Sequence, residues 1–475
     1  MLRIGYVGII RPLFKGDSPQ AAQRSLERLK DLGKEHDFEV VTANVSGNDK
    51  HVATGQDIPP FAVSNLGAAE QAAKQLKDEK LDFLFIQHTT FTTGDLLVPL
   101  LHAAKRVGVW ALPESAADRE EGGPLPLNAL CGLNMTLSFL DHPEVAKKEP
   151  VKWFYGEATS AWFLERLEPT LTALKGLQAL ESSRILQIGG TAPSFFGIEE
   201  FPSLKSVTVE TKELAELFDR VAGISDSEAQ GLASDWEKRE RLEAPREHLV
   251  NAARVELGLR SLAEEGDYNA LAIRCWPELP DACGSMACAS VGRLGDTNIP
   301  TACEGDVMGA LSMRVLGGMS GGATILMDLS DVDLTDNTLQ FWHCGNAPLE
   351  WAAGGNTRLT THFNRDGVGV VRDMVLRSGR ATGFRLLSQG KEALVMAGTF
   401  TQPEKAGFNG VRGWLGDLSW NGVEMDAQTF VANVLDHRLP HHFAFGTGEM
   451  TEALNELGSW LGARVLEAQP ERKTL

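Results

Sequence analysis

The sequence contains no long hydrophobic run, and this absence excludes a helical membrane span. No apolar stretch reaches the roughly 20 residues needed to cross a bilayer. The N-terminal segment MLRIGYVGIIRPLF is interrupted by Gly, Arg and Pro before a signal-peptide core can form. We therefore expect a cytoplasmic protein with no membrane partner.

Positive charge and cysteine are also scarce. The chain has 45 Lys and Arg residues against 64 Asp and Glu residues, so its formal net charge is -19. A surface of this sign repels phosphate backbones, and we expect no nucleic-acid partner. The 6 cysteines include no C-x-x-C pair, and their spacings suit neither zinc nor an iron–sulfur cluster. Free thiols in a reducing compartment are therefore expected.

Nucleotide-binding loops are missing as well. The first predicted strand is followed by PLFKGDSP, which has no G-x-G-x-x-G run, so dinucleotide binding has no support there. The Gly-rich segment LGGMSGGAT has no Lys followed by Ser or Thr, and it precedes a strand. We predict a tight turn at this segment rather than a phosphate loop.

Strand-like and helical segments alternate over most of the first two thirds of the chain. A buried strand is predicted at 2–9, and further strands at 37–45, 81–88, 107–113, 184–190, 204–210 and 269–276, with helices between most of them. This βαβ rhythm predicts two doubly wound parallel α/β domains, over 1–150 and 151–315. Short strand-like runs separated by Gly, Asn and Asp follow, with late helices near 426–436 and 449–462. They predict an antiparallel, β-barrel-like domain over 316–475.

Three polar sites in the second half of the chain form a metal-site pattern. They are Glu304 in TACEGDV, Asp328 in TILMDLSDVD, and the pair His441 and His442 in LPHHFAFGTG. Two carboxylates and one imidazole leave open positions on a divalent ion, and this donor set favours Mg²⁺ or Mn²⁺. Solvated caps, turn caps and surface or hydrogen-bonded histidines are the alternatives that spacing alone leaves open.

A polar loop near the N-terminus gives candidate substrate contacts. The segment QHTTFTTGD follows the carboxyl end of a predicted strand, where open α/β sheets place their ligands. Gln87 and Phe91 in this segment are therefore candidates for substrate binding.

The segment from AIRCWPELP to TILMDLSDVD, which includes TACEGDV, resembles the L-fucose isomerase and L-arabinose isomerase superfamily. The downstream segments FWHCGNAP and LPHHFAFGTG extend the resemblance, which covers most of the chain and is strongest over 268–348. The separation of Glu304 from Asp328 matches the fucose isomerase branch, whereas the arabinose branch generally has Glu at the second position.

The resemblance implies roles for these residues. Glu304 and Asp328 would bind the metal and act as the catalytic acid/base pair, and one of the two histidines would complete the metal shell, with His442 favoured over His441. His343 would be a ligand or a substrate contact. The implied metal is Mn²⁺, with Mg²⁺ or Co²⁺ as alternatives.

The implied reaction interconverts an aldose and a ketose by proton transfer through a cis-enediol. A non-catalytic sugar-binding or regulatory protein with the same fold stays open, as does a metal-dependent epimerase or aldolase. Asp306, two residues after Glu304, is expected to support the site or to cap a helix.

The resemblance leaves the sugar open among fucose, arabinose and sulfonated hexoses such as sulfoquinovose. A sulfonate would need fixed cations, and the candidates near predicted strand ends or turns are Arg11, Lys15, Arg184, Arg274 and Arg365. Arg274 ranks first because an unpaired charge in an apolar strand would be costly. The resemblance also implies a homo-oligomer, a hexamer or a related assembly, in which Gln87 and Phe91 serve a neighbouring subunit.

Overall fold

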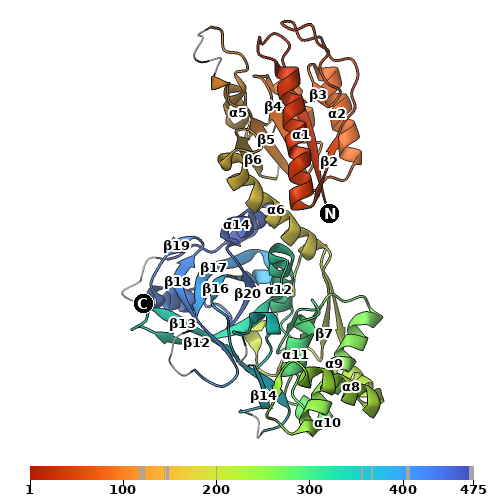
Figure 1. The fold of residues 1–475 in the computed structure, drawn as a ribbon, viewed down its shortest axis with the longest axis vertical. Coiled ribbons are helices and arrows are strands. Elements are labelled where there is room, and N and C mark those ends of the chain that lie inside the picture. Colours follow the sequence, from red (N-terminus) through yellow and green to blue (C-terminus); the bar gives the residue numbers. More distant parts are fainter. Residues whose placement is uncertain are drawn as a thin grey trace. The chain divides into compact units, whose positions relative to one another are not determined.

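The computed structural model describes residues 1–116, 119, 123–143, 145, 149–198, 201–354, 357–364, 367–402 and 407–469. The chain forms two compact units, Met1–Leu174 and Lys175–Leu475 (Figure 1). Within the described residues, no helix combines the length and apolar composition that a membrane span requires. The predicted three-domain boundaries stay a prediction.

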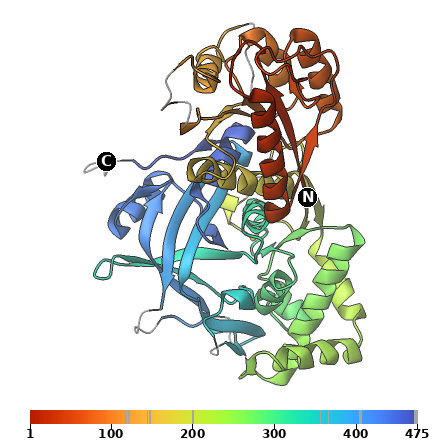
Figure 2. The same cartoon turned by 45° about the horizontal axis from the view of Figure 1, so that its top comes forward.

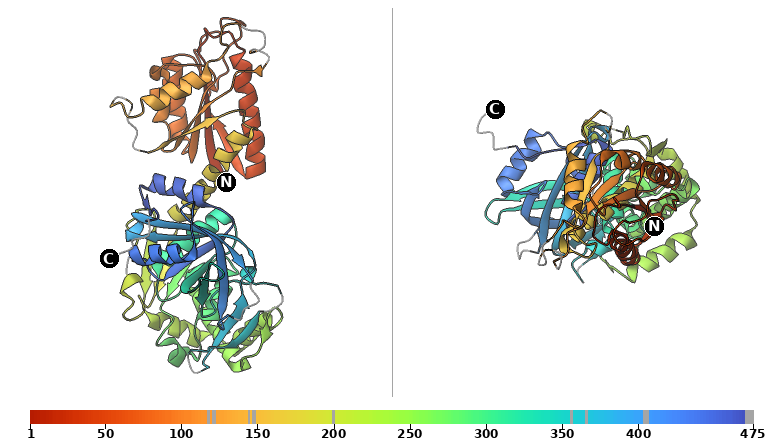
Figure 3. Two further views of the ribbon diagram at one scale, coloured as in Figure 1. Left: turned by 90° about the vertical axis from the view of Figure 1, so that its left-hand side faces the viewer. Right: turned by 90° about the horizontal axis from the view of Figure 1, so that it is seen from above.

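The first unit is built on a six-stranded parallel sheet with the order β2-β1-β4-β5-β6, in which β3 also pairs with β1. Its strands are β1 (Leu2–Ile9), β2 (Phe38–Thr42), β3 (Ala62–Val63), β4 (Phe83–His88), β5 (Val107–Ala111) and β6 (Val151–Tyr155). Its described helices are α1 (Ser18–His36), α2 (Leu66–Asp78), α3 (Gly94–Leu101), α5 (Ala129–Ser138) and the first part of α6 (Ala161–Glu181). Helices flank the sheet in Figure 3. The predicted parallel α/β architecture of this segment is confirmed.

Local sequence explains where α1 begins and which face it buries. Asp17 is the N-cap, because its side chain accepts a hydrogen bond from the backbone N–H of Gln20, and a proline lies in the first turn. Ala22, Leu26 and Leu29 recur at helical spacing and are buried. The helix therefore presents one apolar stripe to the core.

The second unit contains a four-stranded parallel sheet with the order β11-β10-β7-β8. Its strands are β7 (Arg184–Ile188), β8 (Thr208–Lys212), β10 (Ala270–Ile273) and β11 (Thr301–Ala302). The accompanying helices are α7 (Leu214–Gly223), α8 (Asp226–Glu237), α9 (Arg246–Glu265), α10 (Leu279–Cys283), α11 (Cys288–Gly295) and α12 (Val307–Ser320). A second parallel α/β segment is therefore present, as predicted.

The rest of the second unit is an eleven-stranded mixed sheet with the order β21-β17-β16-β20-β12-β13-β18-β15-β14-β9, in which β19 pairs with β18. Its strands are β9 (Arg241–Leu242), β12 (Ile325–Asp333), β13 (Thr338–His343), β14 (Arg358–Thr361), β15 (Val370–Val375), β16 (Gly379–Leu387), β17 (Glu392–Thr401), β18 (Val411–Trp420), β19 (Val423–Glu424), β20 (His442–Thr447) and β21 (Arg464–Val465). The late helices are α13 (Ala427–Asp436) and α14 (Thr451–Leu461), and the short 3₁₀ helices are η1 (Phe196–Ile198), η2 (Leu349–Trp351) and η3 (Ser388–Gly390). Because β17 also pairs with β18, six antiparallel strands are linked in a closed cycle of pairings. The barrel-like form of this segment stays a prediction.

The tight turn predicted for LGGMSGGAT is wrong in its first half, because α12 continues through Ser320. Gly318 in this helix lies against α6, since a Cβ at that position would lie 2.4 Å from the Cβ of Ala179. The glycine therefore permits two helices to approach closely. The helix ends only at Gly321, which adopts a left-handed conformation with a φ of 69°.

The mixed sheet fixes the side-chain directions that build the site. Ile325 and Met327 of β12, and Phe443 and Phe445 of β20, belong to one hydrophobic core. Because side chains alternate along a strand, Asp328 points to the opposite face from this core. The strands β16 and β20 contact α12 in the second unit (Figure 2). Asp306, at the start of this helix, binds Arg385 of β16 and His442 of β20.

Candidate metal centre

Glu304 lies in the short loop between β11 and α12, and its backbone is held in an uncommon conformation. Its φ is 61° and that of Gly305 is 77°. The carbonyl of Glu304 accepts a hydrogen bond from the N–H of Ala192 at 3.0 Å, and the carbonyl of Gly305 accepts one from Gln187 Nε2 at 3.0 Å. A left-handed glutamate is rare and costly. The loop after β7 thus fixes the loop that carries this carboxylate.

The Gly305→Ala substitution is expected to displace Glu304. A Cβ at Gly305 would lie 2.1 Å from the carbonyl oxygen of Gly190, and the positive φ disfavours alanine independently. The loop must therefore move away from β7. We expect a lower kcat and a melting temperature several degrees below that of the parent, measured by steady-state kinetics and calorimetry. Gly190→Ala is the matched control, since a Cβ at Gly190 meets no atom within 4 Å although its φ of 71° is also left-handed. Equal effects of both substitutions would show that backbone strain alone is responsible.

The two predicted acids and the histidine pair come together in the second unit. Strand pairing places Asp328 directly opposite His442. The Nε2 atom of His442 lies 3.5 Å from Asp328 Oδ1 and 3.7 Å from Glu304 Oε2. His441 Nε2 is 3.1 Å from the same Glu304 oxygen. Four side chains from three separate segments of the sequence therefore surround one small volume.

Asp306 fixes the orientation of His442. Its Oδ2 accepts a hydrogen bond from His442 Nδ1 at 2.9 Å, and its Oδ1 accepts one from the N–H of Gly309 at 2.8 Å, which caps α12. Arg385 donates to both oxygens, at 2.5 and 2.9 Å. Of the two roles expected for Asp306, the helix cap is confirmed, and its support of the site stays a prediction.

Electrostatics keep Asp306 ionised. Burial alone would raise the pKa of this carboxyl, but the charge of Arg385 and the hydrogen bond from His442 outweigh burial and hold the pKa well below its ordinary value. An ionised carboxylate only accepts hydrogen bonds, so the proton of a neutral His442 ring resides on Nδ1. The Nε2 atom then carries a bare lone pair and faces Glu304 and Asp328.

This arrangement fits a divalent cation. The Nε2 atom of His442 and Oδ1 of Asp328 are buried and find no hydrogen-bond partner among the described residues. At 3.5 Å they are too far apart for a good hydrogen bond, and two lone pairs repel each other. One ligand atom from each of Glu304, His441 and His442 lies within 4.8 Å of the others, and the same holds for Asp328, His343 and His442. An ion among these atoms would satisfy lone pairs that nothing else in the described chain satisfies.

His343 has the opposite hydrogen-bonding pattern. Its Nδ1 accepts a hydrogen bond from the N–H of Cys344 at 2.8 Å, so the proton of a neutral ring resides on Nε2. That Nε2 is buried and has no partner within the described part of the chain. A protonated nitrogen cannot bind a metal but can donate to an oxygen. Of the two roles left open by the sequence, this geometry favours a substrate contact over a metal ligand.

Glu304 and His441 stabilise each other's charged forms. Burial would raise the pKa of Glu304, but the hydrogen bond from His441, together with the positive charge of His442 and His441 when they are protonated, lowers it overall. Burial would lower the pKa of His441, but the hydrogen bond to Glu304 and the charge of Asp328 raise it overall. His441 is also half-exposed, with 43% of its side-chain surface accessible. It therefore links a buried carboxylate to solvent.

Arg274 lies at the same edge of the parallel sheet as Glu304. It follows β10 directly, and its backbone N–H donates to Ile188 at 3.0 Å. Its guanidinium pairs with Glu278 at 3.0 Å, while its Nε is buried and lacks a hydrogen-bond partner within the described ranges. The expected unpaired charge is therefore partly compensated, and one donor stays available.

Gln87 and Phe91, the substrate contacts predicted in the first unit, interact with neighbouring side chains. Gln87 is fully buried in β4, where its Oε1 accepts hydrogen bonds from Tyr6 at 2.7 Å and Thr89 at 3.1 Å. Phe91 packs near Phe14, with ring centroids 6.3 Å apart. The Nε2 of Gln87 is buried and has no hydrogen-bond partner among the described residues. The roles of Gln87 and Phe91 as substrate contacts stay predictions.

The remaining cationic candidates for sulfonate binding have different surroundings in the structure. The backbone N–H of Arg11 donates to the Thr90 hydroxyl at 2.7 Å, and Lys15 is exposed. Arg184 is an exposed residue at the start of β7 that donates to the carbonyl of Gly266. Arg365 lies outside the described residues.

Sequence reasoning missed Arg385 and two aromatic residues. The ring of Phe195 lies 5.5 Å from Trp276 and 5.7 Å from His441, so an aromatic wall adjoins the centre. No spacing pattern in the sequence predicts that these aromatic rings lie beside His441. Arg385 could have been found from the sequence, because an arginine within the apolar strand segment GFRLL needs an acidic or hydrogen-bonding partner.

Several known proteins are similar to this chain in sequence. No protein-family model matches the chain. A sulfoquinovose isomerase of Priestia aryabhattai is 29% identical over 419 residues, which cover 85% of this chain and 89% of the relative. The sulfoquinovose isomerase of Priestia megaterium gives the same values. That of Alkalicoccus urumqiensis is 26% identical over 398 residues, covering 82% of this chain and 86% of the relative.

The chain resembles sulfoquinovose isomerases. The predicted aldose–ketose isomerase class is confirmed by this similarity, since it extends over most of the chain and of each relative. Placement in the wider superfamily of fucose and arabinose isomerases stays a prediction, as do the metal ligands.

Proposed function

We propose that this enzyme is a metal-dependent isomerase that converts a sulfonated hexose aldose such as sulfoquinovose into its ketose. The printed names of the relatives support the substrate class. The observation that carries the metal dependence is the bare Nε2 of His442 between Glu304 and Asp328, held there by Asp306. Mn²⁺ suits this donor set, with Mg²⁺ or Co²⁺ as alternatives.

Glu304, Asp328 and His442 would hold the ion, which would act as a Lewis acid on the carbonyl and hydroxyl oxygens of the open-chain sugar. Glu304 takes the proton from C2 of the aldose and returns it to C1 of the ketose. Asp328 carries the hydroxyl proton from O2 to O1, so that the sugar passes through a cis-enediol and no atom is gained or lost. His441 holds the Glu304 carboxylate in place, and His343 Nε2–H donates to a sugar oxygen.

Turnover in D₂O is expected to place solvent deuterium at C1 of the ketose, because the carried proton exchanges while Glu304 holds it. Mass spectrometry and NMR of the product measure the label, with the Mn²⁺-loaded protein and a panel of sulfonated and unsulfonated aldoses. A chelator should abolish turnover and Mn²⁺ should restore it. An epimerase would yield a labelled aldose and no ketose, an aldolase would yield shorter fragments, and a binding protein would yield neither. Each of these three outcomes contradicts the proposal.

The Arg274→Gln substitution is expected to reduce discrimination in favour of the sulfonate. If the free Nε–H of Arg274 contacts the anionic group, its loss should lower kcat/KM for sulfoquinovose by about 10- to 100-fold, the usual worth of a charged hydrogen bond. The kcat/KM for the 6-deoxy analogue, which has no sulfonate, should stay near the parent value. Arg184→Gln is the matched control, because Arg184 begins β7 at the opposite edge of the sheet. A parallel loss for both sugars would mean that Arg274 has only a structural role.

A further inference from the structure

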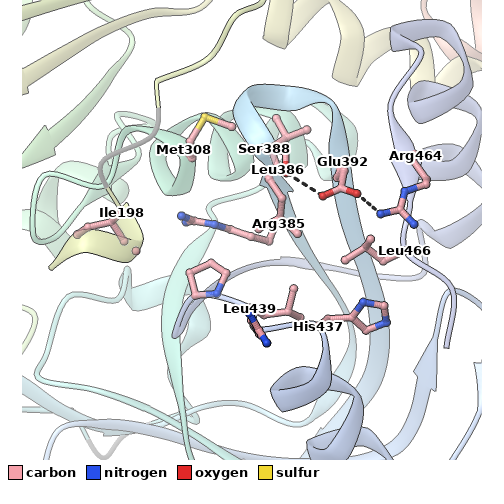
Figure 4. Close-up of a pocket in the computed structure, with 14 residues that line it drawn as sticks. Ile198, Met308, Arg385, Leu386, Ser388, Glu392, His437, Leu439, Arg464 and Leu466 are labelled. Carbon is pink, nitrogen blue, oxygen red and sulfur yellow. Dashed lines mark hydrogen bonds and ion pairs between the residues drawn. The ribbon is translucent and has the colours of Figure 1, made fainter. Parts of the chain in front are cut away.

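A cavity in the second unit is lined in part by Arg385, the residue that binds Asp306. It has a volume of about 390 Å³ and is bordered by the end of β16, the segment between α13 and β20, and β21. Figure 4 shows its lining, with Arg385 extending into the space between Ile198 and Leu439. None of the residues assigned a role in the isomerase reaction lines this cavity. Its size is typical of a small-molecule site.

Three arginines line this cavity. Arg385 is only 2% exposed, and although its two terminal nitrogens bind Asp306, its Nε has no hydrogen-bond partner in the part of the chain that the structure describes. A buried donor of this kind costs free energy until an acceptor reaches it. It therefore marks a place where a ligand oxygen would be stabilised.

Arg438 and Arg464 complete the charge of the pocket. Arg464 forms an ion pair with Glu392, which also accepts a hydrogen bond from Ser388 at 2.7 Å (Figure 4). Arg438 is exposed and makes no ion pair within the described ranges, and its φ of 53° is unusual for a residue with a side chain. Three guanidinium groups thus stand against two carboxylates, Glu392 and Asp306. The excess positive charge favours an anion.

The remaining walls are largely apolar. They include Leu386, Leu439, Leu466 and Ile198. Such walls suit a short carbon skeleton and lower the local dielectric, which strengthens the attraction between a guanidinium and an oxyanion. A polyanion is a poor occupant, since the chain as a whole carries a formal charge of -19. We propose that this pocket binds a small organic anion that carries a phosphate or sulfonate group.

Binding should be measured by isothermal titration calorimetry of the full-length, Mn²⁺-loaded protein. The probes are inorganic phosphate, propyl phosphate and propanesulfonate, none of which has the adjacent hydroxyls that a sugar uses to chelate a metal. We expect saturable binding of at least one propyl probe, tighter than that of inorganic phosphate because of the apolar walls. The better of the two propyl probes identifies the anionic group.

Variants localise the binding. Arg438→Gln should weaken it by about ten-fold or more, as expected for a lost charged hydrogen bond. Leu439→Trp should abolish it by filling the cavity without changing any charge. Arg380→Gln is the control, because Arg380 is paired with Glu449 and does not line the pocket. Absence of saturable binding for all three probes, or binding to Arg438→Gln and Leu439→Trp that equals the parent, would overturn the proposal.

Arg385 connects the pocket to the metal centre, and this consequence rests on the proposed function. An anion at Nε shares the guanidinium charge that holds Asp306, which in turn orients His442. Occupancy should therefore weaken Mn²⁺ binding, measured by titration with and without the saturating propyl probe. An unchanged Mn²⁺ affinity would refute this coupling between the two sites but would not contradict the proposal that the pocket binds an anion. A protein that binds the probe but shows no isomerase activity would refute the proposed function alone.

Discussion

Glu304→Gln is expected to lower kcat by about 10²- to 10⁴-fold, the range that a positioned acid or base contributes. The amide has the size of the carboxylate and can still accept a hydrogen bond from His441, which lies 3.1 Å from Glu304 Oε2 in the parent. It cannot take a proton from C2 of the sugar. The loss should therefore appear in kcat rather than in folding, measured by steady-state kinetics together with the melting temperature.

Metal titration separates the two roles of Glu304. If the residue only binds the ion, saturating Mn²⁺ should restore kcat in Glu304→Gln. If it also carries the proton, kcat stays low at every Mn²⁺ concentration. Asp331→Asn is the control, because Asp331 is an exposed acid on the same strand as Asp328 and takes no part in the centre. Near-parental kcat in Glu304→Gln would remove this residue from the mechanism.

The placement of the two acids was accessible from the sequence, because local signals determine it. Glu304 follows a buried strand and precedes a helix, and Asp328 lies where a strand leaves the hydrophobic core. Hydrophobic periodicity alone indicates such positions. It also predicted the parallel sheets, since strands such as Leu2–Ile9 are buried on both faces and read as continuous apolar runs.

The choice between the histidines was not accessible, because it depends on hydrogen bonds between distant segments. His441 and His442 are adjacent and chemically identical in the sequence. What separates them is Asp306, a residue 136 positions away whose carboxylate accepts a hydrogen bond from His442 Nδ1. The tautomer follows from that contact, and no spacing rule contains it. The surroundings of Gln87 could not be predicted for the same reason, since its Oε1 accepts a hydrogen bond from the hydroxyl of Tyr6 on a neighbouring strand.

Asp306→Asn is expected to weaken Mn²⁺ binding by about 10- to 100-fold, the usual effect of losing the partner that orients a metal-binding histidine. Asp306 receives four hydrogen bonds, two of them from Arg385. An asparagine that keeps its oxygen toward Gly309 turns its NH₂ group toward His442 Nδ1. That nitrogen would then accept, the ring proton would move to Nε2, and the metal-facing lone pair would be lost.

The same substitution should lower the free energy of unfolding by about 3–5 kcal/mol, because it leaves the charge of Arg385 buried without its counter-ion. The double variant Asp306→Asn/Arg385→Met removes that charge and should recover most of the stability. It should not recover the Mn²⁺ affinity, since the double variant still lacks the carboxylate that accepts the hydrogen bond from His442 Nδ1. Denaturant unfolding and Mn²⁺ titration of the parent, the single and the double variant measure the two quantities separately. If stability and metal affinity recover together, Asp306 acts only by holding the fold, and the orientation of His442 does not depend on its carboxylate.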